Sequence, residues 1–314
     1  MGRMVDGKWL TDAEASAVAA DGSWQRSPSL LRRQIGHDPD LPATPGRYHL
    51  YAAWNCPWAH RVLLARAILG LEAALPVSFV APRRSAEGWV FDAAAGYRDD
   101  LFGLGALHAV YARGMPDYSG RVTVPLIVDR DSGDLIANES ADILRSLPVA
   151  FAAAARHPRD LYPRDLRPEI DAWNERIYPA LNNGVYRAGF AETQSAYETA
   201  AEGVFDMLDA IETRLADAPW LAGDRMTEAD IRLFPTLARF DVAYFTAFKL
   251  GRRRICDYPA IWRYARRFHA LPGVAETVRF DIYRRGYHSR SDKRNPLGIV
   301  PIAPDIDWSL SAPG

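Results

Sequence analysis

The sequence predicts an α/β domain followed by an all-helical domain, and three observations support this prediction. Strand and helix patterns alternate over residues 46–150. Beyond Pro148 the strand patterns stop, and the apolar periodicity of helices takes over. A Pro-containing stretch at residues 148–168 separates the two patterns as a linker. We therefore divide the chain into an N-terminal extension (1–45), an α/β domain (46–150) and a helical domain with a C-terminal extension (151–314).

The α/β domain is expected to run strand, helix, strand, then a hairpin and a second helix. We place these elements at residues 47–53, 57–69, 75–80, 123–129, 135–137 and 139–147, with a turn at 131–133 and an irregular insert at 81–120. Proline at the first position of the first helix is favourable there, because that position needs no backbone N–H partner.

The helical domain shows two amphipathic patterns. In the first, apolar residues recur on one helix face at Val204, Phe205, Leu208, Ile211 and Leu215. The second begins at Asp230, where Thr227 and Asp230 form a capping-box pattern, and continues with Phe234, Leu237, Tyr244 and Phe248. We expect Asp230 to be a structural cap. The N-terminal extension is expected to be irregular, with Trp9 and Trp24 docking it onto the body.

The composition excludes several function classes. The 314 residues carry a formal charge of −1, so no nucleic-acid or membrane partner is indicated. The arginines at residues 252–285 are read as a solvated or ion-paired surface. The only cysteines, Cys56 and Cys256, form no disulfide framework, and with seven scattered histidines they give no metal pattern. Without a signal peptide or a membrane-spanning stretch, the default location is cytoplasmic.

The sharpest local signal is the segment Trp54-Asn55-Cys56-Pro57-Trp58-Ala59-His60-Arg61, at a strand-to-helix junction. A sulfur there faces the unsatisfied N–H groups of the first helical turn and the positive end of the helix dipole. Both stabilise a thiolate, the nucleophilic form of cysteine. A buried, inert cysteine is the commoner fate of this residue type, but the Cys-Pro-Trp-Ala pattern after a strand favours Cys56 as a nucleophile.

The fourth residue of that pattern is Ala59, so no second cysteine is available nearby. Cys56 therefore forms no local disulfide, and Cys256 is not expected to reach it. A mixed disulfide on Cys56 must be resolved by an outside thiol. This predicts a small thiol cosubstrate and a two-stage exchange.

Two further segments suit a peptide-like ligand. Val124-Pro125 interrupts an otherwise clean strand, and proline there removes a ladder donor. A cis bond would turn the backbone of Val124 outward toward an extended ligand.

Glu139-Ser140 follows a strand and opens a helix, which places a carboxylate, a hydroxyl and free N–H groups at one corner. Alone this corner is weak evidence, because Ser at a helix start is usually a cap.

Taken together, these motifs resemble the glutathione transferase superfamily over roughly residues 46–290. The resemblance implies the glutathione transferase fold, in which an α/β thioredoxin-like N-terminal domain binds glutathione and an all-α C-terminal domain binds the substrate. Within the superfamily the chain is most similar to the glutathionyl-hydroquinone reductases of the Xi class. That similarity rests on residues 55–61, the long N-terminal extension, the insert that holds Trp89, and three tyrosine contexts at residues 182–190, 239–244 and 285–287.

The resemblance also implies the site residues and partners. Glutathione, as cosubstrate, would be bound by Trp89, Arg121, Val124, Glu139 and Ser140. Tyr186, Tyr244 and Tyr287 would surround the sulfur and an aromatic glutathionyl-hydroquinone, so the catalytic set would be these three tyrosines with Cys56. No metal is implied, and a homodimer is implied by the resemblance alone.

The chemistry requires a proton donor, because a thiolate that attacks a sulfur bonded to an aromatic ring leaves a carbon centre to be protonated. Tyr186, between Gly184 and Gly189 on an expected loop, is the best candidate, with Tyr244 and Tyr287 second. The expected function is glutathione-dependent reduction of S-glutathionyl-hydroquinones through a Cys56–glutathione mixed disulfide. The alternatives are an omega-like thioltransferase or dehydroascorbate reductase, and a non-catalytic interaction protein with the same fold.

Overall fold

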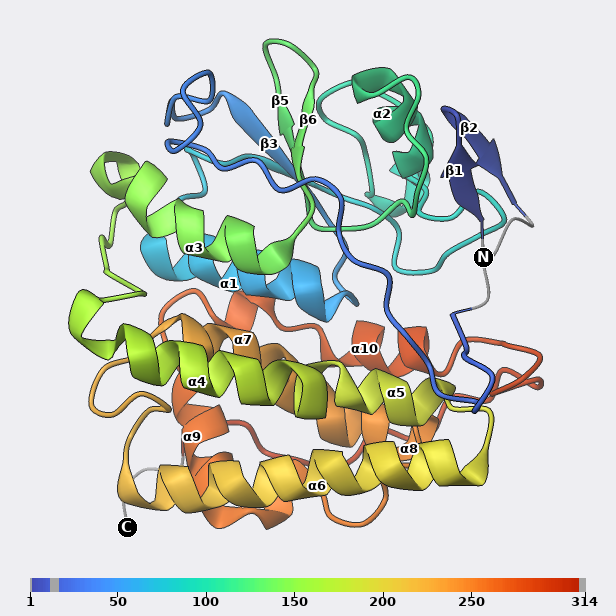
Figure 1. Ribbon diagram of the computed structural model, residues 1–314, viewed down its shortest axis with the longest axis vertical. Coiled ribbons are helices and arrows are strands. Elements are labelled where there is room, and N and C mark those ends of the chain that lie inside the picture. Colours follow the sequence, from blue (N-terminus) through green and yellow to red (C-terminus); the bar gives the residue numbers. More distant parts are fainter. Residues whose placement is uncertain (1, 12–16, 311–314) are drawn as a thin grey trace. The chain divides into compact units, whose positions relative to one another are not determined.

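The computed structural model describes residues 2–11 and 17–310, and the chain divides into two compact units. The first unit comprises residues 1–15 and 28–159, and the second comprises residues 16–27 and 160–314. Each unit therefore combines a piece of the N-terminal segment with one of the two sequence patterns. Figure 1 labels the α-helices and most of the strands of both.

The first unit is built on a four-stranded mixed sheet with the order β4–β3–β5–β6. β3 (Tyr48–Ala52) pairs in parallel with β4 (Val77–Phe79) and antiparallel with β5 (Leu126–Asp129), which in turn pairs antiparallel with β6 (Leu135–Ala137). Every residue of β3, β5 and β6 is buried, which explains why these strands show no alternation of apolar and polar residues. The strand order and directions match the expected strand, helix, strand and hairpin.

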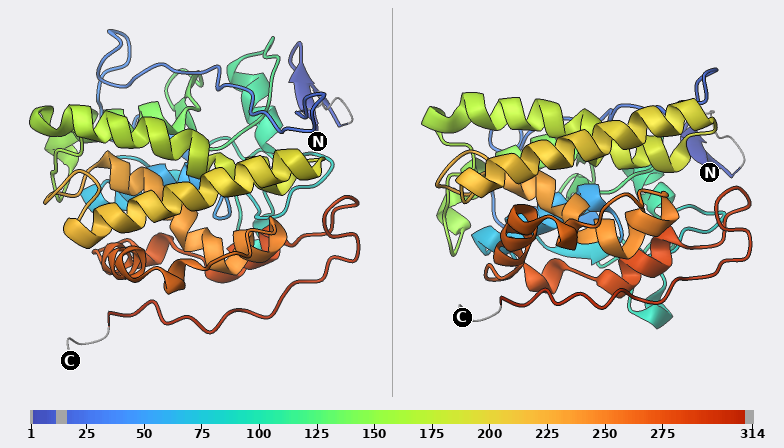
Figure 2. Two further views of the ribbon diagram at one scale, coloured as in Figure 1. Left: turned by 60° about the horizontal axis from the view of Figure 1, so that its bottom comes forward. Right: turned by 90° about the horizontal axis from the view of Figure 1, so that it is seen from below.

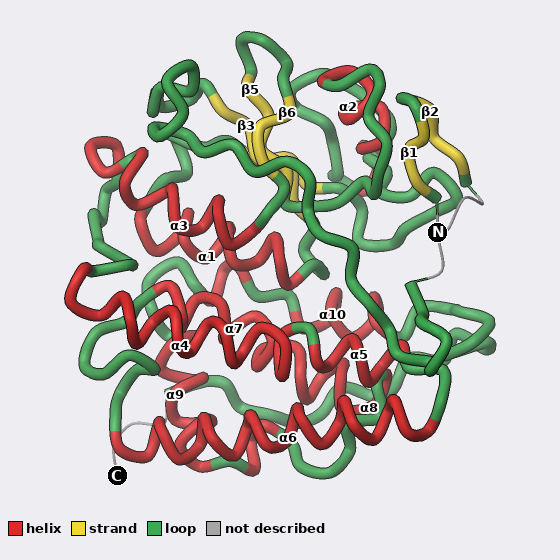
Figure 3. The backbone as a smooth tube through the Cα atoms, viewed as in Figure 1, coloured by secondary structure: helices red, strands yellow, loops and turns green. Residues whose placement is uncertain are grey.

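Two helices of this unit, α1 (Pro57–Leu69) and α3 (Ser140–Ala150), lie side by side (Figures 1 and 3). α1 spans the predicted residues. It ends at Gly70, whose φ of 67° lets its N–H bond back to the carbonyls of the last turn. α3 runs past Pro148 to Ala150, beyond its predicted end, and the linker that follows contains only the short 3₁₀ helices η2 (Ala152–Ala154) and η3 (Arg164–Leu166).

The insert at residues 81–120 was predicted to be irregular. It contains α2 (Leu107–Gly114) and the 3₁₀ helix η1 (Ala93–Ala95). Leu107, Val110 and Tyr111 are buried at the i, i+3, i+4 spacing of a helix face. The helical signal was present but spans only eight residues between stretches rich in glycine. The prediction of an irregular insert was wrong at this point.

The N-terminal extension is likewise more ordered than predicted. β1 (Arg3–Val5) and β2 (Lys8–Leu10) pair antiparallel as a hairpin. Its turn residues Asp6 and Gly7 both have positive φ, at 45° and 73°, as expected of an Asp-Gly hairpin turn. The Trp9 ring stacks on His108 at 5.0 Å, and Trp9 Nε1 donates to the Ala86 carbonyl. The hairpin therefore docks through its tryptophan, as the sequence indicated.

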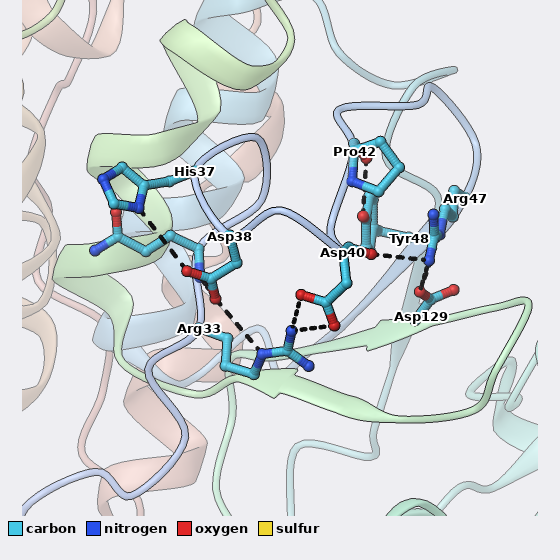
Figure 4. Close-up of polar contacts among 9 residues, drawn as sticks. Arg33, His37, Asp38, Asp40, Pro42, Arg47, Tyr48 and Asp129 are labelled. Atoms are coloured by element: carbon cyan, nitrogen blue, oxygen red, sulfur yellow. Dashed lines mark hydrogen bonds and ion pairs between the residues drawn. The ribbon is translucent and has the colours of Figure 1, made fainter.

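Residues 33–42 of the extension carry an ion pair of their own and a hydrogen bond from the sheet, and a further ion pair ties Arg47, just before β3, to β5. Figure 4 shows Arg33 bonded to Asp40 at 2.5 Å and Arg47 bonded to Asp129 of β5 at 2.6 Å. The Tyr48 hydroxyl donates to the Pro42 carbonyl. Because Arg47 and Asp129 are both largely shielded from water, their pair is held more firmly than the exposed pair at Arg33.

The second unit is helical. Its elements are α4 (Arg167–Ile177), the π-helical turn η4 (Tyr178–Asn182), α5 (Gly184–Phe190), α6 (Gln194–Asp217), α7 (Glu228–Arg239), the π-helical turn η5 (Phe240–Tyr244), α8 (Phe245–Ala247), the 3₁₀ helix η6 (Ile255–Asp257), α9 (Pro259–His269), the 3₁₀ helix η7 (Ala275–Thr277) and α10 (Phe280–Tyr287). Figure 2 shows the long α6 running alongside α4 and α5. Across the described part of the chain, no helix combines the length and apolar composition needed to cross a bilayer.

The two amphipathic patterns pack as predicted. The apolar face of α6 is buried at Val204, Phe205, Leu208, Ile211 and Leu215. The capping box at the start of α7 is also present. Asp230 accepts hydrogen bonds from the backbone N–H groups of Thr227 and Leu221 and from the Tyr264 hydroxyl. Burial raises the pKa of this carboxyl to about 6, so Asp230 is a buried structural cap.

Candidate active site

Cys56 is the N-cap of α1, directly after β3. Its Sγ accepts a hydrogen bond from the Ala59 N–H at 3.5 Å, so the sulfur satisfies one of the otherwise unpaired N–H groups of the first turn. The side chain is half-buried, which leaves part of it open to solvent. A cysteine held at a helix N-terminus and not sealed off has the surroundings of a reactive thiol.

The neighbouring side chains fix this turn. The Trp54 ring stacks on Phe79 of β4 with a centroid distance of 4.0 Å. Asn55 Nδ2 donates to the Pro82 carbonyl at 2.8 Å. Both contacts join the loop before α1 to the end of β4, so the position of Cys56 is set by the sheet.

The Val124–Pro125 peptide bond is cis, which the sequence had left open. The Cys56 thiol donates to the Val124 carbonyl oxygen with a distance of 3.4 Å. The segment before β5 therefore lies beside the sulfur, which places two of the sequence-predicted residues in direct contact.

Glu139 and Ser140 open α3, as predicted. Glu139 is the N-cap, and its carboxylate accepts the Ala141 N–H at 3.1 Å. Ser140 is buried, and its hydroxyl accepts a hydrogen bond of 3.4 Å from Arg61, a buried residue of α1. The cap of this helix is therefore Glu139 and not Ser140, and the buried Arg61 adds a positive charge next to the corner.

Trp89 lies on the insert, and Arg121 follows it directly. Trp89 is only 4 % exposed, and within residues 2–11 and 17–310 its buried Nε1–H has no hydrogen-bond acceptor. A buried indole N–H normally has an acceptor, so this donor fits a group supplied by a ligand. Arg121 is exposed, and its carbonyl accepts the Tyr118 hydroxyl.

The three predicted tyrosines meet in the second unit. The hydroxyl oxygens of Tyr186 and Tyr287 lie 2.6 Å apart, and that of Tyr244 lies 3.5 Å from the first and 3.3 Å from the second. We call Tyr186, Tyr244 and Tyr287 the tyrosine cluster. They come from α5, η5 and α10, so three separate elements converge on one point.

We predicted that Tyr186 lies on a loop, but it lies in α5. The flanking glycines permit close helix packing. A Cβ at Gly189 would come within 2.2 Å of the Phe248 ring, and one at Gly184 within 3.1 Å of the Val204 side chain. The glycines reflect tertiary contacts that the local sequence does not show, and they do not break the helix. The loop assignment was wrong.

The hydroxyls of Tyr244 and Tyr287 are held in their protonated form. Burial raises the pKa of Tyr244 and of Tyr287 well above the usual value for a phenol, and Tyr186 raises both further, while the charge of Arg239 lowers both. A protonated phenol donates a hydrogen bond or a proton at neutral pH. A phenol with so high a pKa gives up its proton only to a strongly basic centre, such as a carbon atom that receives an electron pair.

Sequence reasoning missed the residues around the cluster. Trp24 stacks on Phe190 at 5.5 Å, and the Arg26 guanidinium lies 5.0 Å from the Tyr186 ring centre while its Nε donates to Asn183. Trp24 was recognised as a docking residue, but nothing in the sequence indicated its partner. Arg26 carried no signal, because its contacts with Asn183 and Tyr186 are more than 150 positions away.

Cys256 belongs to a different environment. Burial, and after it the charge of Asp241, raises the pKa of its thiol to about 12, so it is protonated and unreactive at neutral pH. Among the described residues, no group of three histidine, cysteine or acidic side chains is arranged to hold a metal ion.

The comparisons with known proteins agree with this geometry. Residues 55–148 match the family model of the glutathione S-transferase N-terminal domain, and residues 194–267 match that of the C-terminal domain. The chain belongs to the glutathione transferase superfamily.

Its relatives within the superfamily include glutathionyl-hydroquinone reductases. The chain is 44% identical to the glutathionyl-hydroquinone reductase PcpF of Sphingobium chlorophenolicum, over 97% of this chain and 96% of the relative. It is 41% identical to the glutathionyl-hydroquinone reductase YqjG of Escherichia coli, over 98% of this chain and 97% of the relative. The glutathione-bound structure of YqjG superimposes with a TM-score of 0.86 over 97% of this chain and 96% of that one, at 40% identity. A Xi-class glutathione transferase from Natrialba magadii superimposes with a TM-score of 0.92 over 99% and 96%, at 37% identity.

Proposed function

We propose that this protein catalyses the glutathione-dependent reduction of S-glutathionyl-hydroquinones to hydroquinones. The observation that carries the proposal is a single cysteine at a helix N-terminus, with Ala59 N–H on its sulfur and alanine where a second cysteine would stand. The relatives PcpF and YqjG, both glutathionyl-hydroquinone reductases, support the choice of substrate.

In the first half-reaction, the Cys56 thiolate attacks the glutathione sulfur of the substrate. The new bond is the S–S bond of a Cys56–glutathione mixed disulfide, and the bond that breaks joins sulfur to the aromatic carbon. The electron pair of that bond passes to the ring carbon, which takes a proton and leaves as hydroquinone. A phenol of the tyrosine cluster, with Tyr186 as the first candidate, donates the proton.

In the second half-reaction, a glutathione thiolate attacks the mixed disulfide. Glutathione disulfide leaves, the Cys56 thiolate is restored, and the thiol proton of glutathione replaces the one that the tyrosine gave up. The outside thiol is required because Cys256 remains protonated and no second cysteine lies in the Cys56 segment. The sum is one glutathionyl-hydroquinone and one glutathione converted to one hydroquinone and one glutathione disulfide.

The two parts of the chain divide this work. Residues 46–150 bind glutathione, residues 151–314 bind the aromatic ring, and residues 1–45 form an extension. We propose the following glutathione-binding residues: Trp89, Arg121, Val124, Glu139 and Ser140. Two observations support this set, namely the Trp89 Nε1–H without an acceptor and the helix N-terminus at Ser140, which suits a carboxylate of the tripeptide.

The proposed cycle also bears on location and assembly. It consumes reduced glutathione, which is abundant in reducing compartments, so we propose that the enzyme works in the cytoplasm. We further propose that it forms a homodimer, which light scattering of the purified protein tests directly.

The proposal is tested with the purified enzyme and a synthetic glutathionyl-hydroquinone. Cys56→Ala should abolish hydroquinone release, because the variant cannot form the mixed disulfide. The matched control is Cys256→Ala, which should retain the wild-type rate. Wild-type turnover by Cys56→Ala would refute the proposal.

A further inference from the structure

A buried arginine ends α7 directly before the turn that carries Tyr244. Arg239 is 0 % exposed, and its Nη1 donates to the Pro235 carbonyl at 2.9 Å. It lies five positions before Tyr244, across the π-helical turn η5. Full burial of a guanidinium is costly unless its surroundings stabilise the charge.

Those surroundings are phenols. The Arg239 guanidinium carbon lies 3.8 Å from the centre of the Tyr283 ring. Tyr283 precedes Tyr287 by one turn of α10, so Arg239 packs on the helix face that also presents Tyr287. The cation is thus placed between the elements that carry two members of the tyrosine cluster.

The electrostatics agree with this placement. Burial acts against the guanidinium charge, but Tyr283, Tyr244, Tyr287 and Tyr186 together outweigh it and raise the pKa of Arg239. All three members of the tyrosine cluster are therefore electrostatically coupled to one permanent positive charge. In a dry interior such a charge acts with little screening.

We propose that Arg239 is a positioning residue of the reaction, which stabilises the phenolate formed when the tyrosine cluster gives its proton to the departing ring carbon. This inference rests on the proposed function. As the carbon–sulfur bond breaks, its electron pair takes the phenol proton, and the negative charge remains on a tyrosine oxygen. The other two hydroxyls donate to that oxygen, and Arg239 supplies the compensating charge until the second glutathione returns a proton.

A leaving group that needs no carbon protonation separates this role from a purely structural one. In a mixed disulfide of glutathione with 2-mercaptoethanol, Cys56 attacks the same glutathione sulfur, but the departing group is a thiolate. Arg239 should matter for the hydroquinone substrate and not for the disulfide. A general loss of packing would lower both rates together.

The experiment compares Arg239→Met, Arg239→Lys and the control Arg267→Met in single-turnover assays with both substrates. Arg267 is a suitable control because it is a partly buried arginine that, like Arg239, packs on an aromatic ring, that of Trp220 at 4.3 Å. We expect Arg239→Met to release hydroquinone about 10²-fold more slowly with its disulfide rate within about twofold of wild type. Arg239→Lys should recover most of the loss, and Arg267→Met should behave as wild type.

Three results would overturn the inference. The first is an unchanged hydroquinone rate in Arg239→Met, and the second is an equal loss of both rates in that variant. The third applies if Arg239→Met does not fold, because Arg239→Lys then tests the inference. A folded Arg239→Lys variant that loses the hydroquinone rate as fully as Cys56→Ala would contradict a role for the charge. A wild-type enzyme that releases no hydroquinone removes the proposed function as well, so the two failures are told apart.

Discussion

The hydroxyl oxygens of Tyr186 and Tyr287 lie 2.6 Å apart, although 101 positions separate the two residues in the chain. This separation is typical of a short O–H···O hydrogen bond. Tyr244 completes the arrangement at 3.5 Å and 3.3 Å, so each hydroxyl has two phenolic neighbours. Proton donation by one member then leaves a phenolate that the other two stabilise.

Removal of the Tyr186 hydroxyl should therefore impair chemistry more than binding. We expect Tyr186→Phe to lower kcat for glutathionyl-hydroquinone reduction roughly 10²-fold, the usual contribution of a general acid, because the ring stacking on Phe190 is retained. Tyr197→Phe, which removes an exposed hydroxyl bonded to the Lys249 carbonyl, serves as control. An unchanged kcat in Tyr186→Phe would assign the proton to another donor.

The members of the tyrosine cluster should also act as a unit. The double variant Tyr186→Phe/Tyr287→Phe should lose less than the product of the two single losses, because each single change already disrupts the shared network. The measurement is a double-mutant cycle on kcat. Strictly multiplicative losses would mean that the two hydroxyls act independently.

The two cysteines should differ in reactivity. Burial and the charge of Asp241 keep the Cys256 thiol protonated at neutral pH. We expect iodoacetamide at pH 7 to modify Cys56 and to leave Cys256 untouched, as located by peptide mass mapping. The same treatment of Cys56→Ala should give no adduct, and comparable labelling of Cys256 would contradict the structure.

The glycines of α5 and α6 offer a matched pair of stability tests. Gly189→Ala should destabilise the fold by roughly 2 kcal/mol, because the new methyl group would overlap the Phe248 ring. Gly203→Ala, within α6 and with open space around it, should stabilise by about 0.5–1 kcal/mol. Chemical denaturation measures both. Equal effects at the two positions would show that α5 does not pack as described.

His49 predicts how stability depends on pH. Burial lowers the pKa of this residue of β3 from 6.5 to about 4, so the imidazole stays neutral in the folded state at pH values where it is protonated in the unfolded chain. Between these pH values the unfolded state binds more protons than the folded state. The contribution of neutral His49 to stability is therefore complete above pH 6.5 and is lost as the pH falls to about 4. The loss amounts to roughly 3 kcal/mol over that interval.

The variant His49→Gln isolates this effect, since glutamine still bonds the Ser78 hydroxyl that His49 contacts at 2.9 Å. Between pH 6.5 and pH 4 its free energy of unfolding should fall by roughly 3 kcal/mol less than that of the wild type. Parallel pH curves for the two proteins would show that His49 is not the buried neutral group described.

The local features of the site could be predicted because their causes lie within a few residues. Pro57 and Gly70 mark the two ends of α1, and Cys56 precedes that helix as its N-cap. The capping box of Thr227 and Asp230 similarly predicts the start of α7. In each case the hydrogen-bonding needs of a helix end select residue types at fixed spacings.

The features that could not be predicted depend on distant contacts. The glycines beside Tyr186 indicate a loop when only neighbours are considered, and their reason is the close approach of Phe248 and Val204. Arg26 stands over Tyr186, and Arg239 is buried against Tyr283, although neither arginine differs in local sequence from a surface residue. Their environment is set by packing and not by periodicity.

The central claim is that the Cys56 sulfur takes glutathione from the substrate, and intact-mass analysis tests it most directly. The enzyme is mixed with one equivalent of glutathionyl-hydroquinone in the absence of free glutathione, and protein and small molecules are analysed together. The account predicts one glutathionyl group on Cys56, one equivalent of hydroquinone, and loss of the adduct when glutathione is added. Hydroquinone formed while Cys56 stays unmodified throughout would contradict it.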